Sequence, residues 1–444
     1  MIQQEQERVI TYHTVTLGPL TREGDASVEL VQQDADDTQH TRTLRVPAGL
    51  PGERVTIAVE EPLPPRPGRR SRRWKSRPPK VWITEIHEAS PLRTTAPCPV
   101  FGTCGGCQLQ HMQYEAQLEW KCDVVRHLLQ EIGGFDDPPL LPTVPCNIPW
   151  QYRNHMRFSV NRDGKPGLTA RGTHRVLPLT TCPIAHEHIN RALSILSQHE
   201  NARPQVLIRC GAHSHQLMIQ PAPQPEVAQQ LAEAELDLHT ETMEEILAGE
   251  TFHIRPSSFF QTNTAQAEKM AQMVLTGLLP SSDQSAEAAR QLTVVDAYCG
   301  VGTFALLLAR HVGKVLAIEE SASAIKDAQW NMRDVENVEI LKGKVEAMLP
   351  ALSSHIDGLV IDPPRAGCQQ VILDALIQHP VARIVYVSCD PSTLARDLNI
   401  LCHLHPTYRL RTIQPLDMFP QTAHIESVAV LEHVGNEALE DKTV

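Results

Sequence analysis

The sequence predicts an α/β protein whose C-terminal part is a doubly wound parallel sheet. From about residue 251 onward, apolar runs of strand length alternate with segments of helical periodicity, which is the pattern of βαβ units. A turn with two glycines, Gly300 and Gly302, follows the first strand and opens a helix, as in sheets that bind a ligand at their carboxyl edge. The 444 residues allow two or three domains, so a small β domain and a mixed α+β domain are expected before this sheet.

The elements of the C-terminal domain, residues 251–434, are expected in a regular order. Strands are expected at 293–297, 314–318, 338–341, 358–361 and 383–387, and helices at 304–311, 322–334, 369–378 and 391–402. The polar run at 281–290, directly before the first strand, indicates a surface loop.

The N-terminal region, residues 8–88, has short β-like runs at regular spacing. Runs at 27–31, 43–46 and 55–59 alternate with turn signals, among them glycines and prolines. A last run at 81–86 would close a small barrel or sandwich of the OB type.

A basic stretch, residues 62–80, precedes that last run. From Arg66 to Lys80 it holds eight Lys or Arg residues and no acid, which creates a local positive field. Its prolines favour an extended loop, and Trp74 is able to stack on a base. The stretch is equally compatible with nucleic-acid contact and with a solvated loop.

The central region, residues 89–250, mixes both kinds of element and is expected to be an α+β domain. A cysteine- and glycine-rich loop is expected at 98–107, a helix at 114–132, and strands at 156–160, 206–210 and 216–219.

Composition excludes several classes of protein. The net charge of −12 argues against a protein that binds nucleic acid over its whole surface. No apolar run approaches the roughly 20 residues of a membrane span, and the polar start does not read as a secretory signal. We therefore expect a cytoplasmic protein with no membrane partner. Disulfides are not expected among its eleven cysteines, so each is a core residue, a ligand or a nucleophile.

A candidate ligand site lies at three strand ends. Gly300 and Gly302 let the backbone approach a ligand, and Glu319 ends the next strand, where an acid accepts hydrogen bonds from ribose hydroxyls. The motif Asp362-Pro-Pro-Arg365 follows the strand at 358–361, and its prolines stiffen that loop. This combination fits S-adenosylmethionine or a nucleotide. A tight turn and a rigid loop without a ligand are the alternative interpretations.

Cys389 directly follows an apolar strand, in the motif Ser388-Cys-Asp-Pro-Ser-Thr393. It is therefore expected at the carboxyl edge of the sheet, close to the N-terminus of the next helix, which favours a thiolate. An isolated cysteine is more often a small buried apolar residue. This setting favours a nucleophile instead.

A second group of cysteines has the spacing of metal ligands. Cys98, Cys104 and Cys107 follow the pattern C-x5-C-x2-C, and Cys182 precedes a proline far downstream. Four such thiolates hold zinc or an iron–sulfur cluster, and the Cys-Pro pair favours the cluster. The other six cysteines besides Cys389 are expected to be structural.

These motifs together make the chain resemble the RNA 5-methyluridine methyltransferases, most closely the iron–sulfur-containing 23S rRNA (uracil-C5)-methyltransferases. The resemblance covers almost the whole chain. Residues 46–55 are similar to a TRAM domain, an OB-like RNA-binding barrel, and residues 98–111 to the family's cluster segment. Tyr152-Arg-Asn154 resembles the start of the central domain, and residues 258–263 resemble the lead-in to a Rossmann-like methyltransferase domain. Lys344 departs from the acid or amide that relatives often have there.

The resemblance implies a role for each candidate residue. S-Adenosylmethionine would be bound by Gln261, Tyr298, Glu319 and Asp362, Cys389 would be the nucleophile, and Glu426 in His424-Ile-Glu-Ser427 would be the base. A [4Fe–4S] cluster would be held by Cys98, Cys104, Cys107 and Cys182. RNA would be the partner of a monomeric enzyme, with 23S rRNA favoured.

The implied reaction explains why a thiolate is needed. Carbon 5 of uracil is a poor nucleophile, and addition of Cys389 to carbon 6 places electron density on carbon 5. Carbon 5 then attacks the methyl group, and Glu426 removes its proton so that the cysteine is released. The target uridine must leave its stack to reach both groups.

Three other functions remain open at this point. The same reaction on tRNA is the nearest alternative, although the cluster cysteines and the TRAM-like region favour rRNA. Cytosine-C5 methylation also uses a cysteine adduct, but it normally brings two cysteines together. A non-catalytic RNA-binding assembly factor would not need Cys389, Glu426 and the glycine turn.

Overall fold

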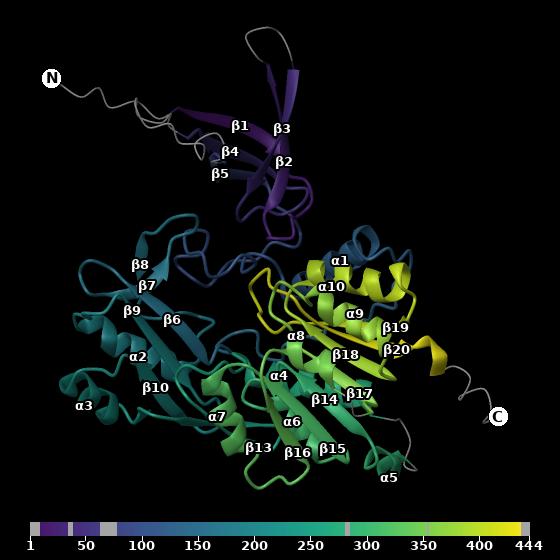
Figure 1. Ribbon diagram of the computed structural model, residues 1–444. Coiled ribbons are helices and arrows are strands. Elements are labelled where there is room, and N and C mark those ends of the chain that lie inside the picture. The colour runs from purple at the N-terminus through teal and green to yellow at the C-terminus, as the bar shows by residue number, and fades with distance from the viewer. Residues whose placement is uncertain (1–8, 34–38, 63–77, 280–284, 353–354, 437–444) are drawn as a thin grey trace, which may run out of the picture. The chain divides into compact units, whose positions relative to one another are not determined.

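The computed structural model describes residues 9–33, 39–62, 78–279, 285–352 and 355–436 (Figure 1). The chain forms two compact units, which we describe separately. The first comprises residues 1–117 and 421–423, and the second comprises residues 118–420 and 424–444. Most of the basic stretch at 62–80, including Trp74, lies outside the described residues.

The described residues of the first unit form five strands. They are β1 (Ile10–Thr16), β2 (Ala26–Gln33), β3 (Gln39–Val46), β4 (Arg54–Glu60) and β5 (Lys80–Glu88). β4 pairs antiparallel with β1 and β5, β2 pairs antiparallel with β3, and inward-facing residues such as Val28, Leu44 and Ile57 share one core. The four strands expected here are present. An OB-like barrel remains a proposal.

The segment that follows β5 is fixed to the strands by a buried acid. Glu53 is fully buried, and its carboxylate accepts hydrogen bonds from the backbone of Leu50 and Ser90 and from the guanidinium of Arg93. Arg93 also donates to the carbonyl of Ala48 over 2.8 Å. This pairing explains why a charge is tolerated inside the unit.

The second unit contains a six-stranded sheet with the order β11-β10-β9-β6-β7-β8. Its strands are β6 (His155–Val160), β7 (Pro166–Thr169), β8 (Val176–Pro178), β9 (Gln205–Cys210), β10 (Gln216–Gln220) and β11 (Asp237–His239). Two helices pack on this sheet, α2 (Glu187–Gln198) and α3 (Pro225–Glu233), while α1 (Tyr114–Glu131) precedes it in the chain. The hairpin of β12 (Met243–Leu247) and β13 (Glu250–Ile254) leads on to α4 (Thr264–Leu278).

A seven-stranded sheet with the order β16-β15-β14-β17-β18-β20-β19 forms the rest of the second unit (Figure 1). Its strands are β14 (Thr293–Ala297), β15 (Lys314–Glu319), β16 (Val338–Lys342), β17 (Gly358–Ile361), β18 (Arg383–Ser388), β19 (Tyr408–Leu416) and β20 (Glu426–His433). β14 to β18 are parallel, whereas β20 runs antiparallel between β18 and β19. Strand order reverses between β14 and β17, which is where such sheets bind ligands.

Both faces of this sheet are covered, because alternate residues of each strand point to opposite sides. Val294 faces a core with α4, α6 (Thr303–Ala309) and α7 (Ala322–Asn331). Its neighbour Val295 faces a core with residues of α1, α8 (Val345–Met348), α9 (Gln370–Gln378) and α10 (Pro391–Asn399). These near-continuous apolar strands are typical of a parallel sheet covered by helices.

The expected C-terminal elements are present, but they differ in places; for example, the helix expected at 322–334 is α7, which ends at Asn331. The last two strands are antiparallel, so the sheet is not wholly parallel. The helix expected to reach residue 402 ends at Asn399 and continues as a π-helical turn, Ile400–Leu404. The run at 281–290 was expected to be a loop but contains a short helix, α5 (Ser285–Ala289). Across the described ranges, each helix is too short or too polar to cross a membrane.

Candidate active site

Four of the expected site residues lie at the carboxyl edge of the seven-stranded sheet. Tyr298 follows β14, Glu319 ends β15, Asp362 follows β17 and Cys389 follows β18. The fifth, Glu426, is the first residue of β20. Since β20 runs antiparallel, its beginning lies at the same edge as the ends of its parallel neighbours.

The pairing of β18 with β20 brings the proposed nucleophile and base together. Ser388 is paired with Ser427 in the register, so Cys389 and Glu426 are the next residues on the two strands. The pKa of the Cys389 thiol is raised to about 11, chiefly by burial and also by the carboxyls of Glu426 and Asp362. Burial also raises the pKa of Glu426 well above its ordinary value. Burial of Cys389 thus opposes the thiolate, which the nearby helix N-terminus would favour.

Arg365 is a site residue that the sequence analysis did not single out. Its guanidinium lowers the pKa of both Cys389 and Glu426, against the effect of burial. It also lies 3.4 Å from Nδ1 of His424, and burial together with Arg365 lowers the pKa of that imidazole to about 4. His424 is thus neutral, and Arg365 supplies positive charge beside the thiol.

A second group of carboxyls lies around the glycine turn. Glu319 accepts hydrogen bonds from the backbone N–H of Gly300, over 3.0 Å, and of Ser321, over 2.7 Å. Asp296 is fully buried, and one of its oxygens accepts from Ala305 while the other has no hydrogen-bond partner among the described residues. The pKa of Asp296 is raised to about 8, chiefly by burial and also by the nearby Asp362 and Glu319.

These acids fit the cofactor that was expected. S-Adenosylmethionine carries a sulfonium and an ammonium cation and two ribose hydroxyls, which suit a group of closely spaced carboxyls. Gly300 has a positive φ of +57°, and a Cβ there would meet no atom within 4 Å, so the turn leaves room beside Glu319. Tyr298 also has a positive φ, +64°, and its hydroxyl donates to Glu346 over 2.8 Å.

Gln261 and Lys344 are placed less directly. Gln261 lies just before α4, and its carbonyl accepts a hydrogen bond from Asn154 over 3.2 Å. The departure noted at Lys344 falls on the N-cap of α8, two residues before Glu346, the partner of Tyr298. Relatives often have an acid or amide at the position of Lys344. In this chain an acid, Glu346, lies two residues further on.

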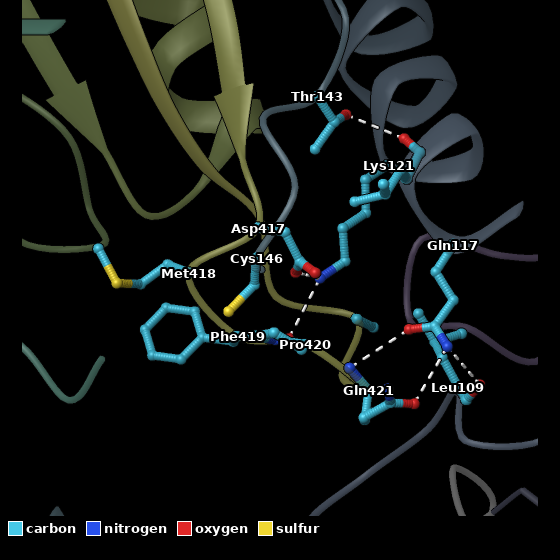
Figure 2. A network of polar contacts seen from close by, with 12 residues as sticks. Leu109, Gln117, Lys121, Thr143, Cys146, Asp417, Met418, Phe419, Pro420 and Gln421 are labelled. Atoms are coloured by element: carbon cyan, nitrogen blue, oxygen red, sulfur yellow. Dashed lines mark hydrogen bonds and ion pairs between the residues drawn. The ribbon is translucent and has the colours of Figure 1, made fainter. Parts of the chain in front are cut away.

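The loop that leads to Glu426 is fixed by a buried ion pair (Figure 2). Lys121 of α1 and Asp417 are both fully buried, and Nζ of Lys121 lies 2.5 Å from a carboxylate oxygen of Asp417. The same Nζ donates to the carbonyl of Phe419 over 3.2 Å. Asn263 donates to the carbonyl of Met418, between these two residues. The connection between β19 and β20 is therefore tied to α1 and to the start of α4.

The expected cluster ligands are divided between the two units. Cys98, Cys104 and Cys107 belong to the first unit, whereas Cys182 belongs to the second. Cys104 is buried, and burial raises its pKa, with a further contribution from nearby Cys98. In the described part of the chain, no three His, Cys, Asp or Glu side chains are arranged to hold a metal ion. The cluster thus rests on sequence spacing.

Cytosine-C5 methylation normally brings two cysteines together, so a second cysteine near the site would favour it. Cys368 is a candidate, because it lies in the loop that begins at Asp362. It is buried, its thiol donates to the hydroxyl of Tyr386, and burial raises its pKa to about 12. These contacts suit the structural role expected for it and not a second nucleophile.

Comparisons with known proteins show what this chain is similar to. Residues 227–434 match the family described as tRNA (Uracil-5-)-methyltransferase. An uncharacterised RNA methyltransferase of Gloeobacter violaceus is 37% identical over 401 residues, which covers 79% of this chain and 85% of the relative. An uncharacterised RNA methyltransferase of Halalkalibacterium halodurans is 32% identical over 471 residues, covering 94% and 96%.

A solved structure shares the fold. The tRNA (uracil-54, C5)-methyltransferase of Pyrococcus abyssi, in complex with S-adenosyl-L-homocysteine, superposes with a TM-score of 0.68 at 23% identity. The match covers 94% of this chain and 99% of that structure. The likeness shows a mixed α/β chain with a Rossmann-like methyltransferase fold.

Proposed function

Because the chain belongs to the RNA 5-methyluridine methyltransferase family, we propose that it methylates carbon 5 of a uridine in 23S rRNA through a covalent adduct with Cys389. The observation that supports this mechanism best is the register of β18 and β20, which puts Cys389 beside Glu426. A nucleophile and a base on adjacent strand ends suit a reaction that attacks one ring carbon and deprotonates its neighbour.

In the first step Cys389, whose side chain is only partly buried, loses its thiol proton to water. The positive charge of Arg365 favours the thiolate, which then forms a bond to carbon 6 of the uracil and leaves an enolate over carbon 5. S-Adenosylmethionine, when bound, supplies the electrophilic methyl group for carbon 5. Glu426 then accepts the proton of carbon 5, and the electron pair of that C–H bond restores the ring double bond as the sulfur leaves.

Glu426 is suited to this last role by its surroundings. A carboxylate with a raised pKa holds a proton more strongly than an exposed one, and so it is a stronger base. On this proposal, the cofactor is held by Gln261, Tyr298, Glu319 and Asp362. The carboxyl of Asp362 is close enough to influence both Asp296 and Cys389.

The cysteines Cys98, Cys104, Cys107 and Cys182 are proposed as ligands of a [4Fe–4S] cluster on the strength of their spacing alone. No step of the reaction is assigned to the cluster. Anaerobically purified protein should contain about four iron atoms per chain and absorb in the visible region. If the purified protein contained zinc and no iron, the four cysteines would be assigned to a zinc site instead of a cluster.

The RNA target is tested by incubating the protein with labelled S-adenosylmethionine and unmodified 23S rRNA or tRNA transcripts. 5-Methyluridine in 23S rRNA is the expected product. Label in tRNA alone would keep the mechanism and change the substrate, an alternative kept open because the similar Pyrococcus abyssi structure is described as a tRNA enzyme. 5-Methylcytidine, or bound cofactor without transfer, would contradict the proposal.

A further inference from the structure

Two adjacent residues of α10, Arg396 and Asp397, hold the loop that carries Arg365. This loop, residues 362–369, leaves β17 after Ile361 and ends at the start of α9. Arg396 donates to two of its carbonyls, that of Ala366 over 3.0 Å and that of Cys368 over 3.2 Å.

Asp397, the next residue of α10, holds the same loop through its carboxylate. It is fully buried, and one carboxylate oxygen accepts from the backbone N–H of Cys368, over 2.8 Å, and from the Tyr386 hydroxyl, over 2.7 Å. Its second oxygen accepts from Nε of Arg396 over 2.8 Å. Both oxygens are hydrogen-bonded, as a buried carboxylate requires.

The contact between helix and loop is close at two further points. Thr393 donates its hydroxyl proton to the carbonyl of Arg365 over 3.2 Å. Gly367 has a φ of +74°, and a Cβ there would lie 2.6 Å from Arg396 and 2.8 Å from Asp397. The loop therefore needs glycine at this position, both for its conformation and for its distance from α10.

The same helix follows the nucleophile directly. Cys389 is two residues before Pro391, the first residue of α10, and Asp390 caps the helix by accepting from the backbone of Ser392. We infer that Arg396 and Asp397 are positioning residues, which hold the Arg365 loop and Cys389 as one rigid piece. The distance between the guanidinium and the thiol is then set by α10.

The inference predicts that Arg396 acts on Cys389 through Arg365. It rests on the proposed function only for the use of the thiolate, since the charges around Cys389 are those of Glu426, Asp362 and Arg365 in any case. We would measure the rate of Cys389 alkylation by iodoacetamide against pH in the full-length protein, with the modified peptide quantified by mass spectrometry. This readout needs neither RNA nor methyl transfer.

Arg365→Met should shift the alkylation profile upward by about half a pH unit or more, since one positive charge beside the thiol is lost. Arg396→Met should shift it in the same direction, and the double variant should shift it no further than Arg365→Met alone. Arg396→Lys keeps a hydrogen-bond donor, so it should shift the profile less than Arg396→Met does. Arg126→Met, which removes an exposed arginine of α1, is the control and should leave the profile unchanged.

Additive shifts in the double variant, or no shift in Arg396→Met while Arg365→Met shifts, would overturn the inference. Asp397→Asn gives a second test, because it keeps the fold's packing while weakening the hold on Cys368 and Arg396; it should shift the profile upward as well. Failure of methyl transfer on every RNA, with these shifts intact, would instead count against the proposed function alone.

Discussion

Replacing Lys121 by methionine tests how strongly the ion pair with Asp417 supports the loop that leads to Glu426. Both side chains are 0% exposed, so the variant leaves the Asp417 carboxylate buried without the ammonium. Removal of one partner from a buried pair costs about 3–5 kcal/mol, against about 0–1 kcal/mol for an exposed pair. We therefore expect a loss of about 3–5 kcal/mol in the free energy of unfolding.

Urea unfolding of the full-length chain, followed by circular dichroism, measures this loss. Because two units need not unfold together, the transition of the second unit is fitted separately. Arg126→Met is a matched control, since it removes a cation of the same helix whose partner, Asp123, is exposed; it should change stability by less than about 0.5 kcal/mol.

A double variant separates the buried charge from the lost packing. Lys121→Met with Asp417→Leu removes both charges, and it should recover at least half of the stability lost in the single variant. If Lys121→Met costs under about 1 kcal/mol, or if the double variant is less stable than the single one, the ion pair does not fix this loop in the way that we describe.

Three further predictions concern the site itself. Glu426→Gln should slow product release by roughly 100-fold or more, so that RNA linked to Cys389 accumulates on denaturing gels; an unchanged rate without adduct would assign the base elsewhere. Burial raises the pKa of Asp296 to about 8, so its contribution to stability is present at low pH and is lost as pH rises from about 4 to 8. The thermal midpoint of Asp296→Asn should therefore depend less on pH across that window. If the midpoints of variant and parent protein changed with pH in parallel, Asp296 would not have this role. Gly367→Ala should destabilise the protein by about 1–3 kcal/mol in urea unfolding, and a neutral effect would mean that the loop and α10 can separate freely.

The C-terminal strands were predictable because their residues carry the signal locally. β14 and β17 were expected at the bounds that the structure shows, since each is a short apolar run flanked by turn residues. Cys389 and Asp362 were placed at strand ends for the same reason. The family resemblance supplied Glu426, and its proximity to Cys389 follows only from the antiparallel register of β20, which no local pattern encodes.

Lys121 and Arg365 show what local patterns leave out. A lysine in an amphipathic helix is expected on the solvent face, and burial of Lys121 depends on an acid almost 300 residues away. Arg365 gains its role from charges on two other strands. Side chains whose function depends on partners distant in the chain become visible only when the fold places them together.

The position of β20 between β18 and β19 has a consequence for how the enzyme is made. Both flanking strands leave the ribosome before β20, yet they have no direct pairing with each other, so the sheet stays incomplete until residues 426–433 insert. β20 also begins with Glu426, the residue that we propose as the general base. On the proposed mechanism, a nascent chain that lacks β20 would hold Cys389 on an incomplete sheet, without the group that releases the methylated ring.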